Sequence, residues 1–224
     1  MENLIFYNAN EAFVYLCSNV LSNGIERGSS GRKWWSTFNM GITILNPIDN
    51  VITIPWRNFK LDYAKIEFDW YLSKDRSAAM IEKYASIWKD IKDENGLLNS
   101  NYGYLMCEDN QYQKIIDKLK SDECSRQAII TIYDGKRYLN MNTKDVPCTL
   151  NMGFRIVNNK LDMSIIMRSL DIWFGFSNDQ YCFSEFQKII AKDLSIGVGN
   201  YYHFSMDAHL YEKHYLKVKN NLNT

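Results

Sequence analysis

Residues 147–181 read PCTLNMGFRIVNNKLDMSIIMRSLDIWFGFSNDQY and combine strand-like segments with several chemically active side chains. Cys148 directly follows a proline at the start of this stretch. Two predicted strands then meet at Asn158-Asn159, a pair of residues that tolerates the positive φ angles of a tight hairpin turn. The stretch therefore predicts a β-hairpin with a thiol at its entrance.

The exit of this hairpin adds a cation, a hydroxyl, an amide and two carboxylates: Arg168, Ser169, Asp171, Asn178 and Asp179. Each group has a plainer explanation when it is taken alone. A single cysteine is more often a small buried hydrophobe than a nucleophile. Arg168 and Asp171 are suited to pair at the surface, and Asn178-Asp179 is suited to cap the helical segment that follows. Their order and spacing within one segment nevertheless favour a shared site.

The bulk composition indicates one well-filled domain. The chain has 224 residues, of which 46% are hydrophobic and 14% are aromatic. The formal net charge is zero, so no broad basic surface for nucleic acid is expected. No apolar run of about 18 residues is present to cross a membrane, and the N-terminus lacks the basic start of a signal peptide. We therefore expect a cytoplasmic protein with no membrane partner.

The five cysteines and three histidines show no spacing that is typical of a metal site. The cysteines also contain no C-x-x-C pair. The sequence therefore predicts reduced thiols and no metal.

Apolar periodicity and turn residues predict a mixture of helices and strands. Helices are expected over residues 8–24, around 66–72, 80–91 and 115–119, over 181–194, and from about residue 209. Strands are expected over 37–44, 128–133 and 201–206 besides the hairpin, and residues 25–33 (IERGSSGRK) are expected to form a loop. Asn8 and Glu11 suit a capping pair for the first helix. This pattern predicts an α+β fold, a mixed β-sheet covered by helices in a single domain that spans residues 1–224.

Three segments outside the hairpin carry further candidate chemistry. The glycines, hydroxyls and guanidinium around Arg27 suit a phosphate, although an ordinary polar turn is the simpler explanation. Glu67 and Asp69 lie in an aromatic segment, where one of them is expected to be buried with a raised pKa unless both face solvent. His209 and Tyr211 are spaced to hold one sugar hydroxyl, or else to be satisfied core groups.

Taken in order, these motifs resemble the thymidylate synthase superfamily over roughly residues 20 to 215. The motifs are Arg27-Gly-Ser-Ser-Gly31, Glu67…Trp70-Tyr71-Leu72, Trp88…Asn95-Gly96…Tyr102-Gly103, Ser125-Arg126, Pro147-Cys148, Arg168-Ser169-x-Asp171, Gly175-x-x-x-Asp179 and Asp207-x-His209-x-Tyr211. Within that superfamily, LNSNYG (98–103), PCT (147–149), MRS (167–169) and FGFSND (174–179) look most like the phage-type deoxycytidylate hydroxymethylases.

The resemblance implies a reaction and a set of residue roles. Cys148 would add to C6 of a pyrimidine nucleoside monophosphate, which activates C5 toward the one-carbon unit of 5,10-methylenetetrahydrofolate. A synthase completes the reaction with hydride, whereas a hydroxymethylase adds water. The implied roles are proton and water handling by Glu67 and Tyr102, phosphate binding by Arg27, Arg126, Arg168 and Ser169, base and sugar contacts by Asn178, Asp179, His209 and Tyr211, and folate contacts by Trp88, Asp171 and Gly175. Because family members donate Arg126 across an interface, the resemblance also implies a homodimer.

Asp179 is the residue that is expected to select the base. Synthases carry asparagine at the aligned position, which donates to O4 of uracil and accepts from N3–H. A carboxylate only accepts, so it favours the exocyclic amine of cytosine. An unpaired buried acceptor costs about 1–3 kcal/mol, which predicts a discrimination of roughly 10-fold to several hundred-fold. The alternative is that Asp179 merely caps the following helix.

Four features depart from the synthase pattern. Thr149 stands where histidine usually follows the nucleophile, and Met167 stands where glutamine usually precedes the arginine; both indicate the hydroxymethylase branch. Gln127 stands where a second phosphate-binding arginine is usual, which weakens the clamp unless Arg32 or Lys33 replaces it. The chain stops at Thr224, and a short tail is expected to harm hydride transfer more than water addition.

Three interpretations follow from the sequence. The first is a cytidylate 5-hydroxymethyltransferase, of the kind that occurs in phages that modify their DNA and in nucleoside antibiotic pathways. The second is an enzyme for a uracil nucleotide, either a thymidylate synthase or a deoxyuridylate hydroxymethylase. The third is a nucleotide-binding homodimer that has lost catalysis.

Overall fold

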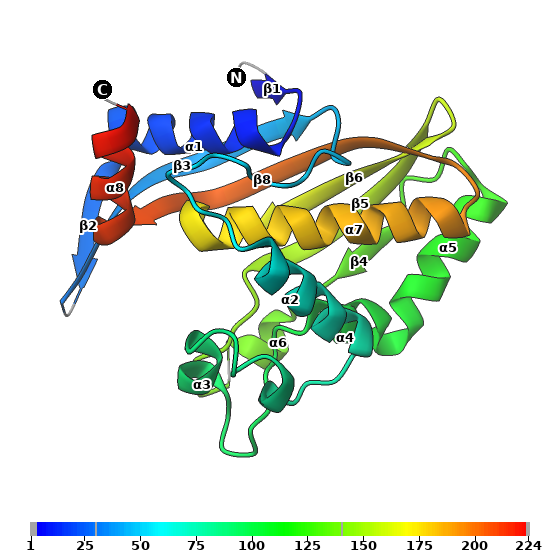
Figure 1. The fold of residues 1–224 in the computed structure, drawn as a ribbon. Coiled ribbons are helices and arrows are strands. Elements are labelled where there is room, and N and C mark those ends of the chain that lie inside the picture. Colours follow the sequence, from blue (N-terminus) through cyan, green and yellow to red (C-terminus); the bar gives the residue numbers. More distant parts are fainter. Residues whose placement is uncertain (1–3, 30, 140, 223–224) are drawn as a thin grey trace.

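The centre of the fold is one eight-stranded mixed β-sheet (Figure 1). The structure is a computed structural model that describes residues 4–29, 31–139 and 141–222. The strands are β1 (Leu4–Phe6), β2 (Ile25–Ser29), β3 (Arg32–Ile44), β4 (Ile129–Thr131), β5 (Thr149–Val157), β6 (Lys160–Met167), β7 (Leu170–Asp171) and β8 (Gly197–Tyr211). Their order is β1-β3-β8-β6-β5-β4, while β2 pairs with β3 and β7 pairs with β8.

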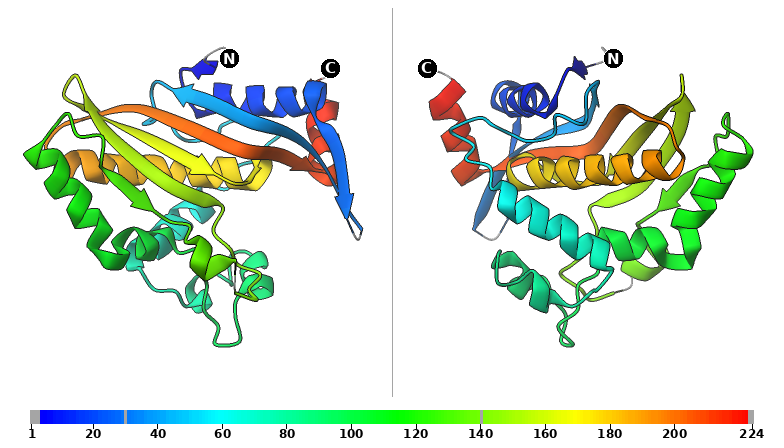
Figure 2. Two further views of the ribbon diagram at one scale, coloured as in Figure 1. Left: turned by 180° about the vertical axis from the view of Figure 1, so that it is seen from behind. Right: turned by 45° about the vertical axis from the view of Figure 1, so that its right-hand side comes forward.

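The helices lie mainly on one face of this sheet, which confirms the predicted α+β architecture (Figures 1 and 2). They are α1 (Ala9–Asn23), α2 (Leu61–Ser73), α3 (Ile87–Ile91), α4 (Tyr102–Cys107), α5 (Gln111–Ser121), α6 (Gly135–Tyr138), α7 (Ser177–Asp193) and α8 (Glu212–Leu222). Short 3₁₀ segments occupy Ala78–Met80 and Glu108–Asn110, and a π-helix occupies Ile172–Phe176. None of these helices is long and apolar enough to cross a membrane within the described part of the chain.

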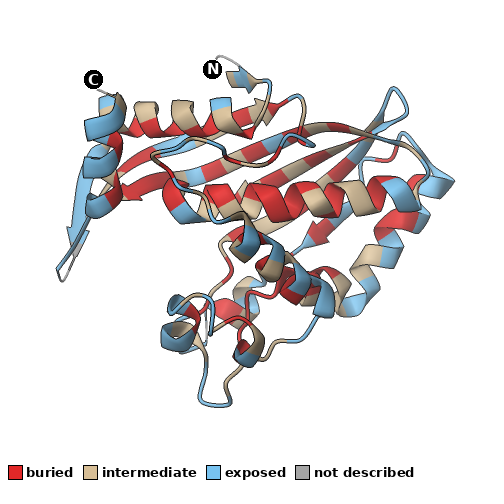
Figure 3. Ribbon diagram, viewed as in Figure 1, coloured by how far each residue is buried: buried red, intermediate tan, exposed pale blue. Residues whose placement is uncertain are grey.

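The core lies between the sheet and helices α1 and α7 (Figure 3). Helix α7 buries Cys182, Phe183 and Ile190, and β6 buries Met163 and Ile165. Fully burying an aliphatic or aromatic side chain of this size contributes about 1.5–3 kcal/mol. The alternation of buried and partly exposed residues along β6 therefore fixes which face of the hairpin meets the helices.

The central hairpin forms as predicted. Strands β5 and β6 pair in antiparallel fashion up to Val157 and Lys160. Asn158 and Asn159 both adopt positive φ angles, 50° and 57°, which match the right-handed twist of the two strands. The predicted capping pair is also present, because the Asn8 side chain accepts from the backbone N–H of Glu11. Local sequence was sufficient for these features.

Three predicted elements differ from the structure. Within the segment expected to be a loop, residues 25–29 and 32–33 form strands, since Arg27 on β2 pairs with Trp34 on β3. The last helix begins at Glu212 rather than near residue 209, because His209 extends β8 and pairs with β3 and β7. Residues 80–91 form turns and the short α3 rather than one helix. In the first two cases, pairing with neighbouring strands outweighs the local preference.

Gly103 is the closest contact point between α2 and α4. A Cβ atom at Gly103 would overlap the carbonyl oxygen of Tyr71. We expect Gly103→Ala to lower the free energy of unfolding by about 1–3 kcal/mol or more, as overpacking does. Urea unfolding would measure the loss. Gly135→Ala is the matched control, because its added methyl group meets nothing nearer than Leu139 Cδ1 at 3.8 Å. Equal stability of the two variants would contradict the close helix contact.

Candidate active site

Cys148 lies at the entrance of β5, and Arg168 holds the segment that contains it. The Arg168 backbone N–H donates to Cys148 O at 2.8 Å. Its side chain also donates from Nε to Pro147 O at 3.1 Å and from Nη2 to Val146 O at 2.9 Å. The guanidinium therefore positions the thiol segment directly, and the predicted surface pair with Asp171 does not form.

The electrostatic surroundings of Cys148 keep its thiol neutral in the free chain. Burial raises the pKa of Cys148 to about 11, although the Arg168 charge opposes this shift. The charges of Asp179, Asp145 and Asp171 raise the pKa further. These carboxylates therefore lie close enough to act on the thiol.

Asp179 lies in the first turn of α7 and points into the same region. Burial, with the charges of Glu67 and Asp171, holds the pKa of Asp179 well above its usual range. A Cβ atom at Gly175 would lie 3.5 Å from Asp179 Oδ2 and 3.7 Å from Asp171 Cβ, so the glycine backbone packs against both acids. Asp179 does not cap α7, because the π-helix runs directly into that helix.

Asp171 performs the capping that the sequence assigned to Asn178-Asp179. Its Oδ1 accepts from Trp173 N at 2.9 Å and from Phe174 N at 3.4 Å, at the start of the π-helix. Burial raises the pKa of Asp171, while His209 and the two backbone N–H groups oppose that shift. Asp171 is thus both a structural cap and a half-buried carboxyl group whose charge acts on Cys148.

Glu67 is buried on α2, whereas Asp69 is exposed. Its Oε1 accepts from Tyr71 Oη at 3.2 Å, and its Oε2 has no hydrogen-bond partner among the described residues. Burial raises the pKa of Glu67 to about 7, and the nearby hydroxyl groups of Tyr71 and Tyr63 oppose this shift. Trp88 Nε1 donates to Tyr63 Oη at 2.9 Å, which places the predicted folate contact beside this carboxyl group.

Tyr102 opens α4 and faces the thiol. Burial raises the pKa of Tyr102, the charges of Asp179 and Cys148 raise it further, and the neighbouring polar groups of Thr149 oppose the shift. Asn101 fixes the start of this helix, because its Oδ1 accepts from Tyr104 N at 2.9 Å. The phenol is therefore held rigidly.

The end of β8 brings His209 and Tyr211 to the site. Their rings meet edge to face at 5.1 Å, and His209 Nδ1 lies 3.3 Å from Asp207 Oδ1. Ser36 Oγ donates to that oxygen at 3.0 Å. Despite burial, His209, Ser36 and the charge of Arg27 lower the pKa of Asp207. His209 also pairs with Asp171 across β7 and β8.

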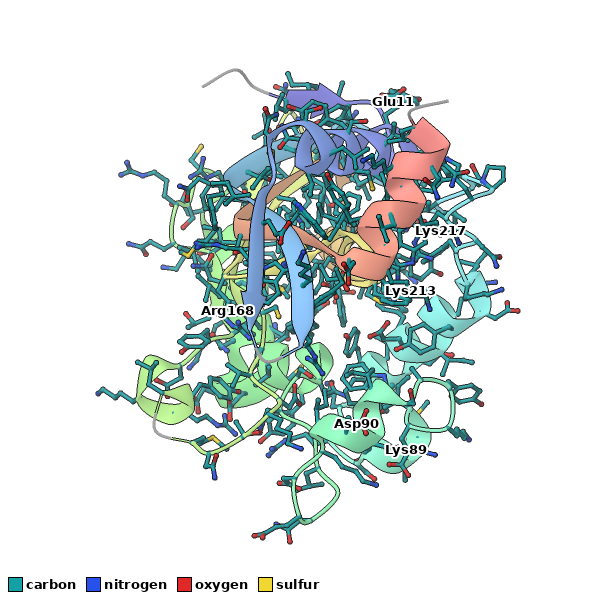
Figure 4. The ribbon with its side chains drawn as sticks, turned by 90° about the vertical axis from the view of Figure 1, so that its left-hand side faces the viewer. Glu11, Lys89, Asp90, Arg168, Lys213 and Lys217 are labelled. Atoms are coloured by element: carbon teal, nitrogen blue, oxygen red, sulfur yellow. The ribbon has the colours of Figure 1, made fainter. Side chains whose placement is uncertain are left out.

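The arginines predicted to bind the phosphate lie farther apart than the residues around Cys148. Arg168 is exposed and lies on the side of the molecule that also presents Lys213 and Lys217 of α8 and Lys89 of α3 (Figure 4). Arg27 lies on the exposed β2 with its guanidinium 5.3 Å from the Phe38 ring centroid.

The remaining predicted residues differ in exposure. Ser169 and Asn178 are half-buried, and Arg126 is exposed beyond α5 without a polar partner among the described residues. The structure thus gathers Cys148, Asp179, Asp171, Glu67, Tyr102, His209 and Tyr211, and it leaves Arg27 and Arg126 at the periphery.

Sequence reasoning missed Arg57, which is buried beneath the π-helix. Its Nε donates to Trp173 O at 2.9 Å and to Ser177 Oγ at 3.1 Å. Its guanidinium also lies 5.0 Å from the Trp173 ring centroid. Burial lowers the pKa of Arg57 to about 10, although the Asp171 charge opposes this shift. The only sequence signal that Arg57 supports the π-helix was its position between aromatic residues in PWRNF.

Comparisons with known proteins agree with this arrangement. The family described as thymidylate synthase matches residues 11–224. The chain is 26% identical over 216 residues to the deoxyuridylate hydroxymethyltransferase of Bacillus phage SP01, covering 90% of this chain and 56% of that protein. It is 25% identical over 179 residues to the enzyme of the same name from Pseudomonas phage M6, covering 78% of this chain and 51% of that protein.

The chain thus spans about half the length of these curated relatives. Thermostable thymidylate synthase A from Bacillus subtilis has the same fold, with a TM-score of 0.81 at 18% identity over 96% of this chain and 84% of that one.

Proposed function

This chain belongs to the thymidylate synthase family, and from that membership we propose that it hydroxymethylates C5 of a cytidine monophosphate nucleotide. The one-carbon unit would come from 5,10-methylenetetrahydrofolate. C5 would lose its proton, tetrahydrofolate would leave, and water would add to the exocyclic methylene that remains. The observation that carries this proposal is the placement of a thiol, Cys148, and a half-buried carboxyl group, Asp179, at one site.

Cys148 supplies the covalent step in this proposal. C5 of a pyrimidine is a poor nucleophile until a thiolate adds to C6, which turns C5 into an enamine-like carbon. The thiol loses its proton as the C6–S bond forms, and the bond breaks again when the product is released. Because the pKa of Cys148 is about 11 in the free chain, substrate must help to form the thiolate. Arg168 is the nearby cation that favours the anion.

Glu67 and Tyr102 are proposed to manage protons and water. A carboxyl group with a pKa of about 7 both takes and gives a proton at neutral pH. The Oε2 atom of Glu67, which has no protein partner in the described structure, is available to hold a water molecule. We assign the addition of water to this side of the site.

The folate supplies a one-carbon unit at the oxidation level of formaldehyde. Trp88, Asp171 and Gly175 are proposed to hold it. The absence of a side chain at Gly175 exposes backbone between the two acids, and Trp88 offers aromatic surface next to Glu67 through Tyr63. These groups suit a flat heterocycle with several hydrogen-bonding atoms.

Asp179 is proposed to read the base, and its ionisation determines how well it does so. The anion accepts from the exocyclic amine of cytosine, and it would face O4 of uracil as a second acceptor. His209 and Tyr211 are proposed to hold the sugar, with Asn178 beside the base. Arg168 and Ser169 are proposed to bind the phosphate together with Arg27 and Arg126.

A uracil nucleotide is the second candidate substrate, and two observations favour it. The relatives from phages SP01 and M6 are named for deoxyuridylate. Burial, with the charges of Glu67 and Asp171, also raises the pKa of Asp179, which favours the neutral carboxyl group more than in an ordinary aspartate. A neutral carboxyl group donates to O4 and accepts from N3–H at the same time, as asparagine does.

Product mass distinguishes the two substrates. The protein would be incubated with methylenetetrahydrofolate and either cytidylate or uridylate, in ribo and deoxyribo forms. A gain of CH₂O on cytidylate but not on uridylate supports the proposal, and the reverse supports the second candidate. A gain of CH₂ on uridylate would identify a thymidylate synthase. If the nucleotide binds but no tritium is released from C5, the protein binds nucleotides without catalysing the reaction.

The preference for cytidylate over uridylate is expected to depend on pH. Because the pKa of Asp179 is raised, the selective anion is present above that pKa and is lost as the pH falls through it. The ratio of kcat/KM for the two nucleotides should therefore fall toward unity at low pH. Competition assays across a pH series would measure it. A constant ratio would show that Asp179 does not read the base through its charge.

We also propose a homodimer through the face of the sheet that the helices leave open. Seen from behind, β3, β8 and β6 have no helix over them within the described residues (Figure 2). On β8, Tyr202 and Met206 are exposed and Phe204 is partly buried, while the alternate residues face the helices. Apolar residues on an uncovered sheet face indicate an interface.

Complementation tests both the dimer and the trans role of Arg126. Arg126→Ala and Cys148→Ala variants should each be inactive, and a mixture that has exchanged subunits should regain roughly a quarter of the wild-type activity, because half of the dimers carry one intact site. Sedimentation should give twice the chain mass. A monomeric mass, or no recovery from mixed dimers, would contradict the shared site.

A further inference from the structure

Asp145 lies three residues before Cys148, and its carboxylate binds a different loop. The side chain is 5% exposed. Its Oδ2 accepts from Asn99 N at 2.5 Å and from Ser100 N at 3.0 Å. Asn99 Nδ2 returns a bond to Asp145 O at 2.9 Å. Three hydrogen bonds thus join the thiol segment to residues 99 and 100.

The loop that Asp145 binds leads directly into Tyr102. Arg76 holds this loop from the other side, donating from Nε to Leu98 O at 2.8 Å and from Nη2 to Asn99 Oδ1 at 2.7 Å. Asn101 Nδ2 donates to Trp70 O at 2.8 Å. Residues 98–101 are each hydrogen-bonded, so they form a rigid base for the phenol.

The segment that contains the thiol, residues 145–148, is also fixed by hydrogen bonds. Asp145 is bound to the loop before Tyr102, the carbonyl groups of Val146 and Pro147 accept from the Arg168 side chain, and Cys148 O accepts from the Arg168 backbone. Asp145 is the residue that connects this segment to the Tyr102 loop. Removing its carboxylate would leave, among the described residues, only the bonds from Asn99 Nδ2 to Asp145 O and Thr143 Oγ1 on the side of the Tyr102 loop.

We propose that Asp145 is a positioning residue that ties the Cys148 segment to the Tyr102 loop and places a negative charge near the thiol. This inference rests on the proposed function, in which Cys148 is the nucleophile. A thiol that stays neutral in the free protein is protected from oxidants and alkylating agents. Burial of a carboxylate requires hydrogen bonds, and the backbone N–H groups of Asn99 and Ser100 supply them to Asp145.

Other charged and titratable groups also act on this thiol, and the test must separate them. They are Arg168 after β6, Asp171 on β7, Asp179 on α7, Tyr102 on α4 and Tyr211 on β8. Asp145 itself faces Arg76 and Tyr138. Substitution of Asp145 leaves all of these groups in place.

Two variants separate the charge of Asp145 from its hydrogen bonds. Asp145→Asn keeps an acceptor for the backbone N–H groups and removes the charge, so the pH profile of Cys148 alkylation by iodoacetamide should move to lower pH. Asp145→Ala removes both, and kcat for tritium release should fall by roughly 10- to 100-fold with KM for the nucleotide changed by less than about threefold. Asp93→Asn is the control, since exposed Asp93 also accepts from two backbone N–H groups, those of Asn95 and Leu97.

The proposal is overturned if Asp145→Asn alkylates with the wild-type pH profile, or if folded Asp145→Ala retains the wild-type kcat. If Asp145→Ala does not fold, the asparagine variant decides alone. The proposal is also rejected if both variants lose stability while the pH profile of Cys148 alkylation is unchanged. A carboxylate with a purely structural role would give that result. Alkylation does not need turnover, so an inactive wild-type protein would refute the proposed function and still leave the charge effect measurable.

Discussion

Replacement of Cys148 by alanine is expected to lower tritium release from C5 of labelled cytidylate by about 10⁴-fold or more, which is the scale for removal of a catalytic nucleophile. Without the C6–S bond, C5 does not become nucleophilic, so neither exchange nor one-carbon transfer proceeds. Nucleotide binding should persist, because the proposed phosphate and base contacts do not involve the thiol. Calorimetric titration of the variant with cytidylate would measure that binding.

Cys107→Ala is the matched control for this experiment. Both cysteines are free and partly exposed, but Cys107 lies at the end of α4 and is not among the groups that act on Cys148. The control should retain wild-type exchange. Turnover by Cys148→Ala would remove the nucleophile from the mechanism, whereas loss of both exchange and binding would indicate a damaged fold.

Replacement of Asp179 by asparagine is expected to shift the base preference toward uracil, lowering the cytidylate-to-uridylate ratio of kcat/KM by roughly 10-fold to several hundred-fold. Asparagine donates to O4 and accepts from N3–H, so it satisfies the uracil edge that a carboxylate opposes. The substitution also removes a charge that raises the pKa of Cys148, and the thiol should therefore alkylate at lower pH. Competition between the two nucleotides measures the ratio directly.

Asp193→Asn provides the control on the same helix. Asp193 ends α7 and accepts from Tyr112 Oη at 2.8 Å, far along the helix from the first turn that carries Asp179. Its substitution should leave the preference unchanged. If Asp179→Asn also leaves it unchanged, the base is read by another group, and the assignment of the substrate must rest on product mass alone.

Local sequence signals were reliable where the deciding interactions are short in range. The Asn158-Asn159 turn, the Asn8 cap and the strand alternation all depend on residues that are near neighbours in the chain. The expectation that an acid in the aromatic segment 67–72 is buried also holds for Glu67, because helical spacing alone places it on the apolar face.

Long-range contacts determined the features that the sequence did not reveal. His209 follows a helix-like pattern but lies in a strand, since its backbone pairs with residues 171 and 36. Arg57 is separated by more than a hundred residues from the Trp173 carbonyl that it binds, so no local pattern marks it.

Periodicity and turn chemistry were therefore enough to identify the hairpin and the α+β class, because a backbone turn and an alternating strand are properties of adjacent residues. Cys148 became the candidate nucleophile only through the resemblance of the ordered motifs to a known family. The tertiary structure alone decided which acids share the site with the thiol and how Asp145 and Arg168 hold it. Burial and Coulomb interactions depend on distances in space, and segments that are far apart in the chain set those distances.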